Sequence, residues 1–337
     1  MEGTIIITGA SGSVAIETVQ QILSSYPQFT LIGTIRDANK ASTNPNTLRL
    51  QGISQQYPMG RFILENLDLS SLKDVRSFAE RITGRVTAGD LPPISAIICN
   101  AFTWSLEQGQ QFSMDKYEQT FQVNHLSHYL LVLKLLQNVN RQNGRIIMLG
   151  SEVHDPKHQN PLAGMGAGLP TNDNLEELIK PGSDLPGKEH DMGWRRYANS
   201  KLANVMFMHS LNQRLEKIPS FVGITAVAMD PGAVVDSRAH AIHRRFVNKL
   251  IFRMMSFLHP VLSLFTYRFR TTKESARDLV ALAVDPKYQS ARGYFDGQTA
   301  IAPATVVTET EQPEALWSAC WNWVEMKDGE TCLSKNM

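Results

Sequence analysis

Residues 4–25 read TIIITGASGSVAIETVQQILSS, and this stretch decides the fold. The β-branched run Thr4–Thr8 predicts a buried strand, and the pattern from Val14 to Ser25 predicts a helix. Only small residues lie between them. At such a turn, backbone N–H groups and the positive end of the helix can meet a dinucleotide pyrophosphate, because no long side chain holds the phosphates away. The opening stretch therefore predicts a dinucleotide-binding βα unit.

Downstream of this unit, short β-branched runs alternate with longer helical patterns, which is typical of βαβ units with a parallel sheet. We expect strands at Phe29–Ile35, Arg61–Leu67, Ile94–Cys99, Arg145–Leu149, Gly223–Met229 and Gly293–Phe295. We expect helices at 71–82, 113–137, 194–217, 271–284 and 313–324. The alternation predicts an α/β fold: a Rossmann-type doubly wound parallel sheet flanked by helices.

Two insertions interrupt this alternation. Residues 152–193 are rich in Gly, Pro, Asn and Asp and contain one expected short helix, Asn174–Ile179, and residues 236–271 form the second insertion. No linker separates independent halves, so we expect a single domain over residues 1–337. The last helix carries three tryptophans, which we expect to pack onto the body of the protein rather than to bind a cofactor.

Composition limits the class of protein. The chain has 337 residues, of which 42% are hydrophobic and 19% charged, as in a soluble globular protein. A net charge of +1 argues against nucleic-acid binding. The three cysteines lack metal-ligand spacing, which predicts no metal site and reduced thiols in the cytoplasm. No signal peptide is evident before the first strand, and the most apolar stretch, Leu250–Phe265, is too short to span a bilayer.

The cofactor is predicted from the end of the second strand. Arg36 lies there, and an arginine at this place favours a 2′-phosphate through its charge and bidentate geometry. We therefore predict NADP(H) rather than NAD(H), although the neighbouring Asp37 would suit a ribose 2′-hydroxyl. The residues expected at the cofactor from the opening turn and from the ends of the second, third and fourth strands are Gly9, Ser11, Ser13, Val14, Arg36, Asp68, Leu69, Asn100 and Ala101.

The chemistry is predicted from Tyr197 and Lys201, which lie four positions apart and so share one face of a helix. A phenol titrates near pH ~10, and a neighbouring ammonium lowers that pKa by favouring the phenolate. Tyr197 is then a credible general acid or base for a carbonyl or alcohol oxygen. Ser151 follows the fifth strand, where its hydroxyl can bond the same oxygen. Asn124, within the helix after the fourth strand, is expected to have a structural or proton-relay role.

These motifs occur in the order found in the short-chain dehydrogenase/reductase family, which the chain resembles over roughly residues 3–300. Residues 121–128 (FQVNHLSH) and 200–205 (SKLANV) are most similar to the branch of retinol dehydrogenases and protochlorophyllide reductases, and to fungal reductases of secondary metabolism. The resemblance implies that Tyr197 donates the proton, Lys201 holds the nicotinamide ribose, Ser151 orients the substrate and Asn124 completes a tetrad. It further implies nicotinamide contacts from Pro231, Gly232 and Val234.

The chain departs from the family pattern at two places. The usual TGxxxGxG has become TGASGSVA, with Ser13 and Ala15 at two glycine positions. Ser13 is small enough to keep the backbone N–H near a phosphate, and alanine is tolerated at position 15, where close helix–sheet packing is needed. The usual NAG has become Asn100-Ala101-Phe102, which predicts altered packing on the adenosine side of the cofactor.

The insertions bear on substrate and assembly. Ser151 and Tyr197 are 46 positions apart, and in similar carbonyl reductases such an insertion covers the dimerising face. A monomer is therefore favoured over a homodimer. Residues 237–273 contain no Asp or Glu and eight Lys or Arg among many apolar residues. We expect a substrate lid at 236–271 that suits a bulky lipophilic molecule, such as a terpenoid or polyketide. Peripheral contact of 237–273 with an anionic membrane and a solvated charged helix face are the alternatives.

The sequence thus predicts an NADP(H)-dependent oxidoreductase that interconverts a ketone and a secondary alcohol. Two other functions remain open. One is an isomerase, epimerase or cyclase that holds NADP without net redox change. The other is a non-catalytic NADP-binding regulator, against which the complete set of Asn124, Ser151, Tyr197 and Lys201 argues.

Overall fold

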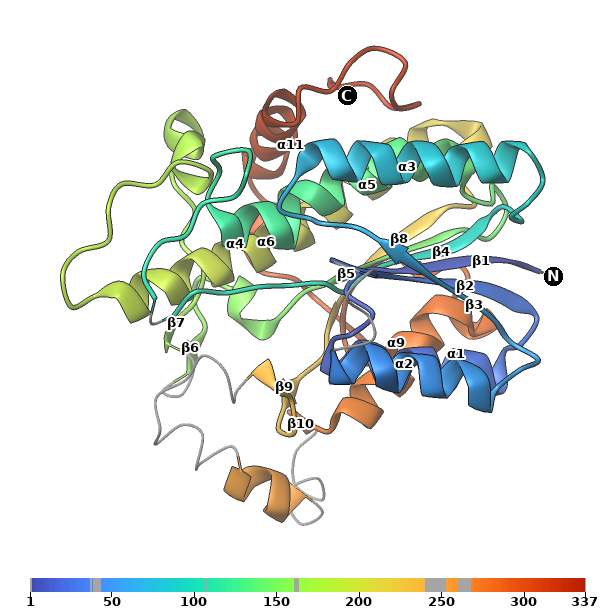
Figure 1. Cartoon of the computed structure of the whole chain (residues 1–337). Coiled ribbons are helices and arrows are strands. Elements are labelled where there is room, and N and C mark those ends of the chain that lie inside the picture. Colours follow the sequence, from blue (N-terminus) through green and yellow to red (C-terminus); the bar gives the residue numbers. More distant parts are fainter. Residues whose placement is uncertain are drawn as a thin grey trace.

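The computed structural model describes residues 2–36, 38, 44–106, 108–160, 164–239, 253–259 and 268–336. Its centre is an eight-stranded sheet in the order β12-β11-β8-β5-β4-β1-β2-β3 (Figure 1). Neighbouring strands are parallel, except that β12 is antiparallel to β11. The strands are β1 (Gly3–Ile7), β2 (Phe29–Ile35), β3 (Arg61–Asn66), β4 (Ile94–Cys99), β5 (Arg145–Leu149), β8 (Thr225–Asp230), β11 (Gly293–Asp296) and β12 (Thr299–Ile301). The expected doubly wound α/β fold is confirmed.

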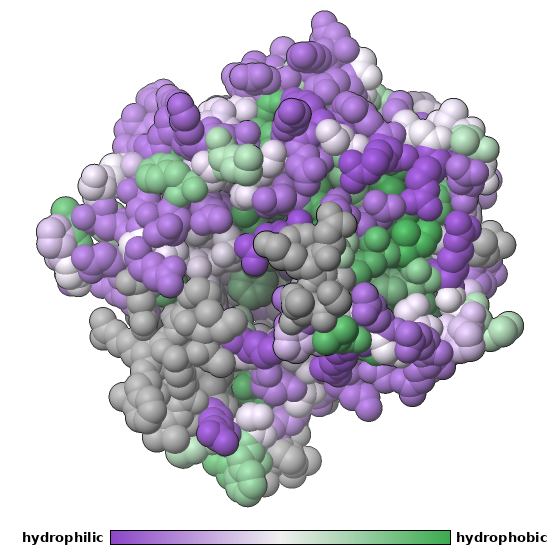
Figure 2. All heavy atoms as spheres, viewed as in Figure 1, coloured by the Kyte–Doolittle hydropathy of each residue, from purple (hydrophilic) through white to green (hydrophobic). Residues whose placement is uncertain are grey.

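The order of the strands reverses between β1 and β4, because the chain leaves β1 toward β2 and β3 and then crosses back to β4. In open α/β sheets, ligands bind beyond the carboxyl ends of the strands at such a switch point. The space-filling view shows the surface hollowed near its centre, on the side where loops leave those strand ends (Figure 2). The fold therefore indicates where a ligand site belongs.

Helices cover both faces of the sheet (Figure 1). One face carries α1 (Ser13–Ser25), α2 (Pro45–Gln56) and α9 (Thr272–Val284), and the other carries α3 (Leu72–Thr87), α5 (Ser127–Leu135) and α6 (Glu189–Lys217). Each face has its own hydrophobic core, because successive side chains of a strand point to opposite faces. On β1, Ile5 and Ile7 belong to one core and Ile6 to the other.

The single helix expected over Ser113–Gln137 is wrong. Helical structure begins with α4 (Gln119–Phe121), passes through a π-helical turn at Gln122–Leu126 and continues as α5. Before α4 the chain turns at Lys116, whose φ of 63° is outside the helical region. The Ser113 hydroxyl accepts the backbone N–H groups of Asp115 and Tyr117, which stabilises the turn against a helix.

The elements α2 and β12 are among those that the sequence did not predict. The helix α2 has only weak apolar periodicity, and it is set by its start: Pro45 occupies the first turn and the Asn44 side chain accepts the N–H of Asn46. β12 pairs antiparallel with β11 after a tight turn. No helix lies between the two strands, so the βαβ pattern used to predict strands does not include β12. Strand and helix ends elsewhere differ from the expectation by a few residues. The largest shifts are the start of α6 at Glu189 instead of Trp194 and the end of α3 at Thr87 instead of Ile82.

The first insertion contains the small hairpin of β6 (Gln159–Asn160) and β7 (Gly164–Met165), and a 3₁₀ segment at Asn172–Leu178 where a short helix was expected. The second insertion begins and ends at a parallel pair, β9 (Ala233–Val234) and β10 (Phe269–Arg270). Within the second insertion residues 253–259 are helical, and 240–252 and 260–267 lie outside the described residues. No helix in the described part of the chain is long and apolar enough to cross a membrane.

The last helix, α11 (Gln312–Trp323), packs against α6 as expected, beside a short helix α10 (Thr305–Thr308). Trp317 is 2% exposed and stacks on Phe207 of α6, with ring centroids 5.7 Å apart. The guanidinium of Arg214, also on α6, lies 3.9 Å from the Trp317 ring centroid. The tryptophan-rich helix is therefore part of the core of this face.

Candidate active site at the carboxyl ends of the strands

A cavity of about 530 Å³ lies at the carboxyl ends of β1, β2, β4, β5 and β8. Apart from Asn124, every site residue expected from the sequence lines it. These residues are Gly9, Ser11, Ser13, Val14, Arg36, Asp68, Leu69, Asn100, Ala101, Ser151, Tyr197, Lys201, Pro231, Gly232 and Val234. The structure thus brings together residues that are spread over more than two hundred positions of sequence.

The turn between β1 and α1 forms one wall of the cavity. Gly9 has a φ of +64°, and a Cβ there would lie 2.9 Å from the Cβ of Ala101, so only glycine fits. Thr8 ties the turn to the end of β4: its Oγ1 accepts the backbone N–H groups of Asn100 and Ala101, both at 3.0 Å. The side-chain amide of Asn100 donates to the Thr8 carbonyl at 2.9 Å. Asn100 therefore holds the turn in place from within the cavity wall.

A buried histidine that the sequence analysis missed, His128, holds the Thr8 side chain by a hydrogen bond. The Nδ1 of His128 lies 3.0 Å from the Asn124 carbonyl oxygen and therefore donates to it. The other ring nitrogen, Nε2, then accepts from Thr8 Oγ1 at 2.9 Å. Burial lowers the pKa of His128 to about 4, so the ring is neutral. The signal available in the sequence was its position one helical turn after Asn124.

Tyr197 and Lys201 lie together on α6 at the other end of the cavity. The Lys201 ammonium is 5.6 Å from the Tyr197 ring centroid and donates to the Leu149 carbonyl at the end of β5, at 2.9 Å. Lys201 is only 3% exposed. Burial lowers its pKa from 10.5 to about 8, and the nearby Asp230 carboxylate offsets part of that effect. A buried cation therefore lies beside the Tyr197 ring in the cavity.

An aromatic wall surrounds Tyr197. The ring centroid of Phe102 lies 6.0 Å from that of Tyr197 and 5.5 Å from the Lys201 ammonium. The altered packing on the adenosine side stays a prediction. Trp104 and Trp194 complete the wall at 5.1 and 5.4 Å from the Tyr197 ring.

Asn124 lies beneath the cavity and is 1% exposed. Its side-chain oxygen accepts the Thr103 N–H at 2.7 Å, and its amide nitrogen donates to the Thr103 carbonyl and to Ser200 Oγ, both at 3.0 Å. The π-helical turn aims the side chain this way, in keeping with the frequent occurrence of π-turns at functional sites. In this structure Asn124 fixes the loop after β4 onto α6, and its role in a proton relay stays a prediction.

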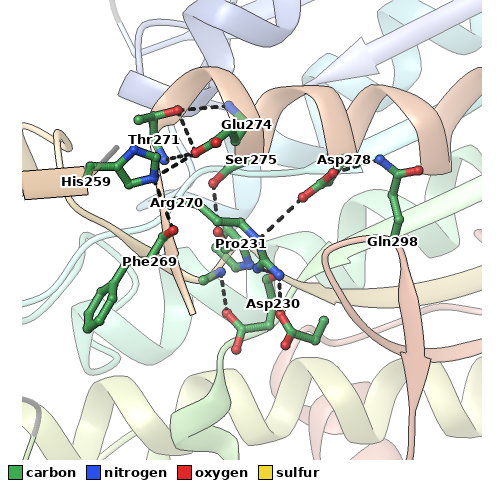
Figure 3. A network of polar contacts seen from close by, with 12 residues as sticks. Asp230, Pro231, His259, Phe269, Arg270, Thr271, Glu274, Ser275, Asp278 and Gln298 are labelled. Carbon is green, nitrogen blue, oxygen red and sulfur yellow. Dashed lines mark hydrogen bonds and ion pairs between the residues drawn. The ribbon is translucent and has the colours of Figure 1, made fainter. Parts of the chain in front are cut away.

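A buried arginine holds the end of β8 (Figure 3). Arg270 donates to the Asp230 carbonyl at 3.3 Å and pairs with Asp296 at 2.6 Å and Asp278 at 3.6 Å. A Cβ at Gly232 would lie 2.8 Å from the Arg270 guanidinium, so this close approach requires glycine. Beside it, the Ser275 hydroxyl of α9 donates to the Pro231 carbonyl at 2.7 Å. These contacts fix residues 230–232 against the cavity.

The same view shows how the described part of the second insertion is attached (Figure 3). The imidazole of His259 lies 3.1 Å from the Glu274 carboxylate and 3.2 Å from the Phe269 carbonyl. Glu274 also closes the capping box of α9 with Thr271. Met255, one turn before His259, lines the cavity. The helical residues 253–259 are therefore tied to the start of α9 and reach the candidate site.

The fold and this cavity define a Rossmann-type α/β protein with a ligand site at the carboxyl ends of its parallel strands. Residues 3–161 match the model of the short chain dehydrogenase family, and residues 235–333 match that of the AcuH dehydrogenase domain. The short-chain dehydrogenase iccH of Talaromyces variabilis is 31% identical, with 98% of each chain covered. The chain therefore belongs to the short-chain dehydrogenase/reductase family, and the resemblance seen in the sequence is confirmed.

More distant relatives agree with this placement. The protochlorophyllide reductase of Chlamydomonas reinhardtii is 26% identical over 93% of this chain and 76% of that protein. The crystal structure of NADPH-bound carbonyl reductase from chicken fatty liver superposes with a TM-score of 0.57, over 89% of this chain and 98% of that one. That structure is 14% identical, so it supports the fold alone.

Replacing Lys201 by methionine should stabilise the protein in a pH-dependent way. Because the folded-state pKa of Lys201 lies below its ordinary value, the stability it contributes above pH 10.5 is lost as the pH falls to about 8. Removing the buried charge should therefore raise the free energy of unfolding by roughly 2 kcal/mol more at about pH 7 than at about pH 10.5. Urea unfolding of both proteins at the two pH values measures this difference.

Lys73→Met, at an exposed position of α3, is the control for pH effects on the unfolded chain. A Lys201→Met effect that is the same at both pH values, or a larger gain at the alkaline pH, would show that the ammonium is not strained by burial.

Proposed function

We propose that the protein is an NADP(H)-dependent oxidoreductase that interconverts a ketone and a secondary alcohol on a bulky lipophilic substrate. The observation that carries the proposal is the pairing of Tyr197 with the buried Lys201 ammonium in the same cavity as the glycine-containing turn of β1 and α1. A phenol beside a cation is suited to exchange a proton with a substrate oxygen, and a dinucleotide turn is suited to hold a redox cofactor.

The residues present fit a nicotinamide dinucleotide. The positive φ of Gly9 and the short space to Ala101 make a cradle that any Cβ would fill. The first turn of α1 has no acidic residue, and its N-cap is Gly12, so its N–H groups suit a phosphate. Arg36 lines the cavity at the end of β2 and would hold a 2′-phosphate. The cofactor, when bound, supplies or accepts a hydride.

The roles of this chain's residues in the reaction follow from their positions. Tyr197 would give a proton to the substrate oxygen in reduction and take it back in oxidation. Lys201 would stabilise the phenolate and hold the nicotinamide ribose, and Ser151, which lines the same cavity, would donate a hydrogen bond to the substrate oxygen. Asn124 would keep α6 and the loop after β4 in register through Ser200 and Thr103.

The substrate class is inferred from the cavity wall. Phe102, Trp104 and Trp194 form a large apolar surface around Tyr197, and Met255 adds a flexible side chain from the second insertion. Aromatic walls and methionines suit a ring-containing lipophilic molecule in an adaptable pocket. This composition supports a terpenoid or polyketide ketone from secondary metabolism, with residues 236–271 acting as its lid.

Tyr197→Phe tests the proposed chemistry. The variant keeps the ring that packs on Trp104 and Trp194 but loses the proton, so turnover should fall at least about a hundredfold while NADPH binding is unchanged. Turnover is followed by the absorbance of the reduced nicotinamide together with chromatography of the products from a panel of cyclic ketones. Calorimetric titration with NADPH measures binding.

Phe121→Tyr, the reverse exchange at a core position outside the cavity, controls for the effect of altering one aromatic hydroxyl on the fold. Two results would contradict the proposal: full turnover by Tyr197→Phe, or formation of a new product by the wild type without any change in the nicotinamide. The second result would favour an isomerase, epimerase or cyclase.

Arg36→Leu tests the choice of cofactor. If the guanidinium binds the 2′-phosphate, the affinity for NADPH should fall about tenfold or more, while the affinity for NADH stays the same. Arg61→Leu is the matched control, since Arg61 is exposed at the opposite end of the neighbouring strand β3. Equal affinities of the wild type for the two cofactors, or an equal loss of both in Arg36→Leu, would remove the argument for NADP(H).

A further inference from the structure

A second cation reaches the cofactor turn from a distant part of the chain. Arg238 follows β9, at the start of the second insertion, and lines the cavity. Its Nη2 donates to the Ser11 carbonyl at 2.6 Å, and both its Nε and its backbone N–H donate to Ser13 Oγ at 3.2 Å. The two partners are 227 and 225 positions away in the sequence. The guanidinium therefore lies across the turn that begins α1.

The contact depends on the side chain of Ser13, one of the places where the chain departs from the family's glycine pattern. A glycine has no side-chain oxygen, so it could accept neither of the two N–H groups that Arg238 directs at Ser13 Oγ. The exchange of glycine for serine and the presence of Arg238 are thus parts of one arrangement. Arginine has five N–H donors, and the contacts with Ser11 and Ser13 use only two of those on the guanidinium.

Within the described part of the chain, Arg238 forms no ion pair with a carboxylate. Burial lowers its pKa, and the neighbouring guanidinium of Arg49 on α2 lowers it further. Arg49 itself is paired with Glu17 of α1. The side-chain contacts of Arg238 are instead with the Ser11 carbonyl and the Ser13 hydroxyl. A half-buried cation beside another cation and a helix N-terminus is a place where an anion would relieve repulsion.

We propose that Arg238 binds the pyrophosphate of the dinucleotide cofactor. This rests on the proposed function. The cation lies over Ser11 and Ser13, the residues of the turn where backbone N–H groups face a pyrophosphate, whereas Arg36 lies at the end of β2, where a ribose 2′-phosphate belongs. In this proposal Arg238 contacts the pyrophosphate and Arg36 contacts the 2′-phosphate. Arg36 selects the cofactor, and Arg238 strengthens the binding of either nicotinamide dinucleotide.

The position of Arg238 also connects the cofactor with the substrate side of the cavity. Arg238 is four residues beyond β9, which pairs with β10, and β10 carries the Arg270 that holds the end of β8. A phosphate bound by Arg238 would fix the first residues of the second insertion against α1. Two of the eight basic residues of 237–273, Arg238 and Arg270, thus serve the interior of the protein, which weakens the argument for these two as membrane contacts.

The experiment compares Arg238→Gln with the wild type in calorimetric titrations without substrate. Glutamine keeps much of the side-chain length and hydrogen-bonding capacity but removes the charge. Four ligands are used: NADPH, NADH, ADP, which has a pyrophosphate only, and adenosine 2′-monophosphate, which has a 2′-phosphate only. We expect about a tenfold loss of affinity for the first three and none for the fourth. The wild-type affinities for the first three should also fall more steeply with salt than those of the variant.

Arg238→Lys keeps the positive charge but loses the planar guanidinium with its several N–H donors. It should lose less affinity for NADPH, NADH and ADP than Arg238→Gln does, which separates electrostatic binding from a structural effect. Arg253→Ala removes an exposed arginine of the same insertion and should bind all four ligands like the wild type. The proposal is overturned if Arg238→Gln binds NADPH, NADH and ADP normally, if its loss is confined to ligands with a 2′-phosphate, or if Arg253→Ala loses as much. A wild type that binds neither NADPH nor NADH would overturn the proposed function as well.

Discussion

The structure depends on one costly interaction, the burial of the Lys201 ammonium at the carboxyl ends of β5 and β8. Its direct partner is the Leu149 carbonyl, and its balancing charge is Asp230, whose own pKa is raised to about 6 by burial. The backbone holds both partners in place. Leu149 belongs to β5, which pairs with a strand on each side, and Asp230 ends β8, whose last carbonyl accepts a hydrogen bond from Arg270. The surrounding structure thus keeps the Lys201 ammonium away from water and beside the Tyr197 phenol. This burial lowers the stability of the fold, a cost that a purely structural site has no reason to carry.

A continuous chain of hydrogen bonds joins this chemical end to the cofactor turn. Thr8 donates to His128, His128 donates to the Asn124 carbonyl, the Asn124 amide donates to Ser200, and Ser200 donates to the Tyr197 carbonyl at 2.7 Å. All residues of this chain of hydrogen bonds are buried except Tyr197. The neutral state of His128 matters here, because a protonated ring could not accept from Thr8. The two ends of the cavity are therefore positioned by one rigid network rather than by independent loops.

The sequence predicted those parts of the site that depend on local pattern. The strand ends, the small-residue turn and the Tyr197–Lys201 spacing follow from short periodicities, and parallel topology then gathers them at one edge. Features set by distant partners were missed. Arg238 reaches Ser13 across 225 positions, and neither residue alone announces the contact. The packing of Phe102 beside Tyr197 depends on the path of the chain after β4, which no local pattern shows. The substrate lid stays a prediction, since most of it lies outside the described residues.

The proposed function requires an NADP(H) molecule in the cavity, with its nicotinamide at Tyr197 and Lys201. A crystal structure of the protein with NADPH tests this most directly. We expect the pyrophosphate on the turn at Gly9–Val14 and the 2′-phosphate at Arg36. We expect the nicotinamide ribose within hydrogen-bond distance of the Lys201 ammonium. A cofactor bound in the opposite direction, or one whose nicotinamide lies away from Tyr197 while Lys201 still contacts only the Leu149 carbonyl, would contradict it.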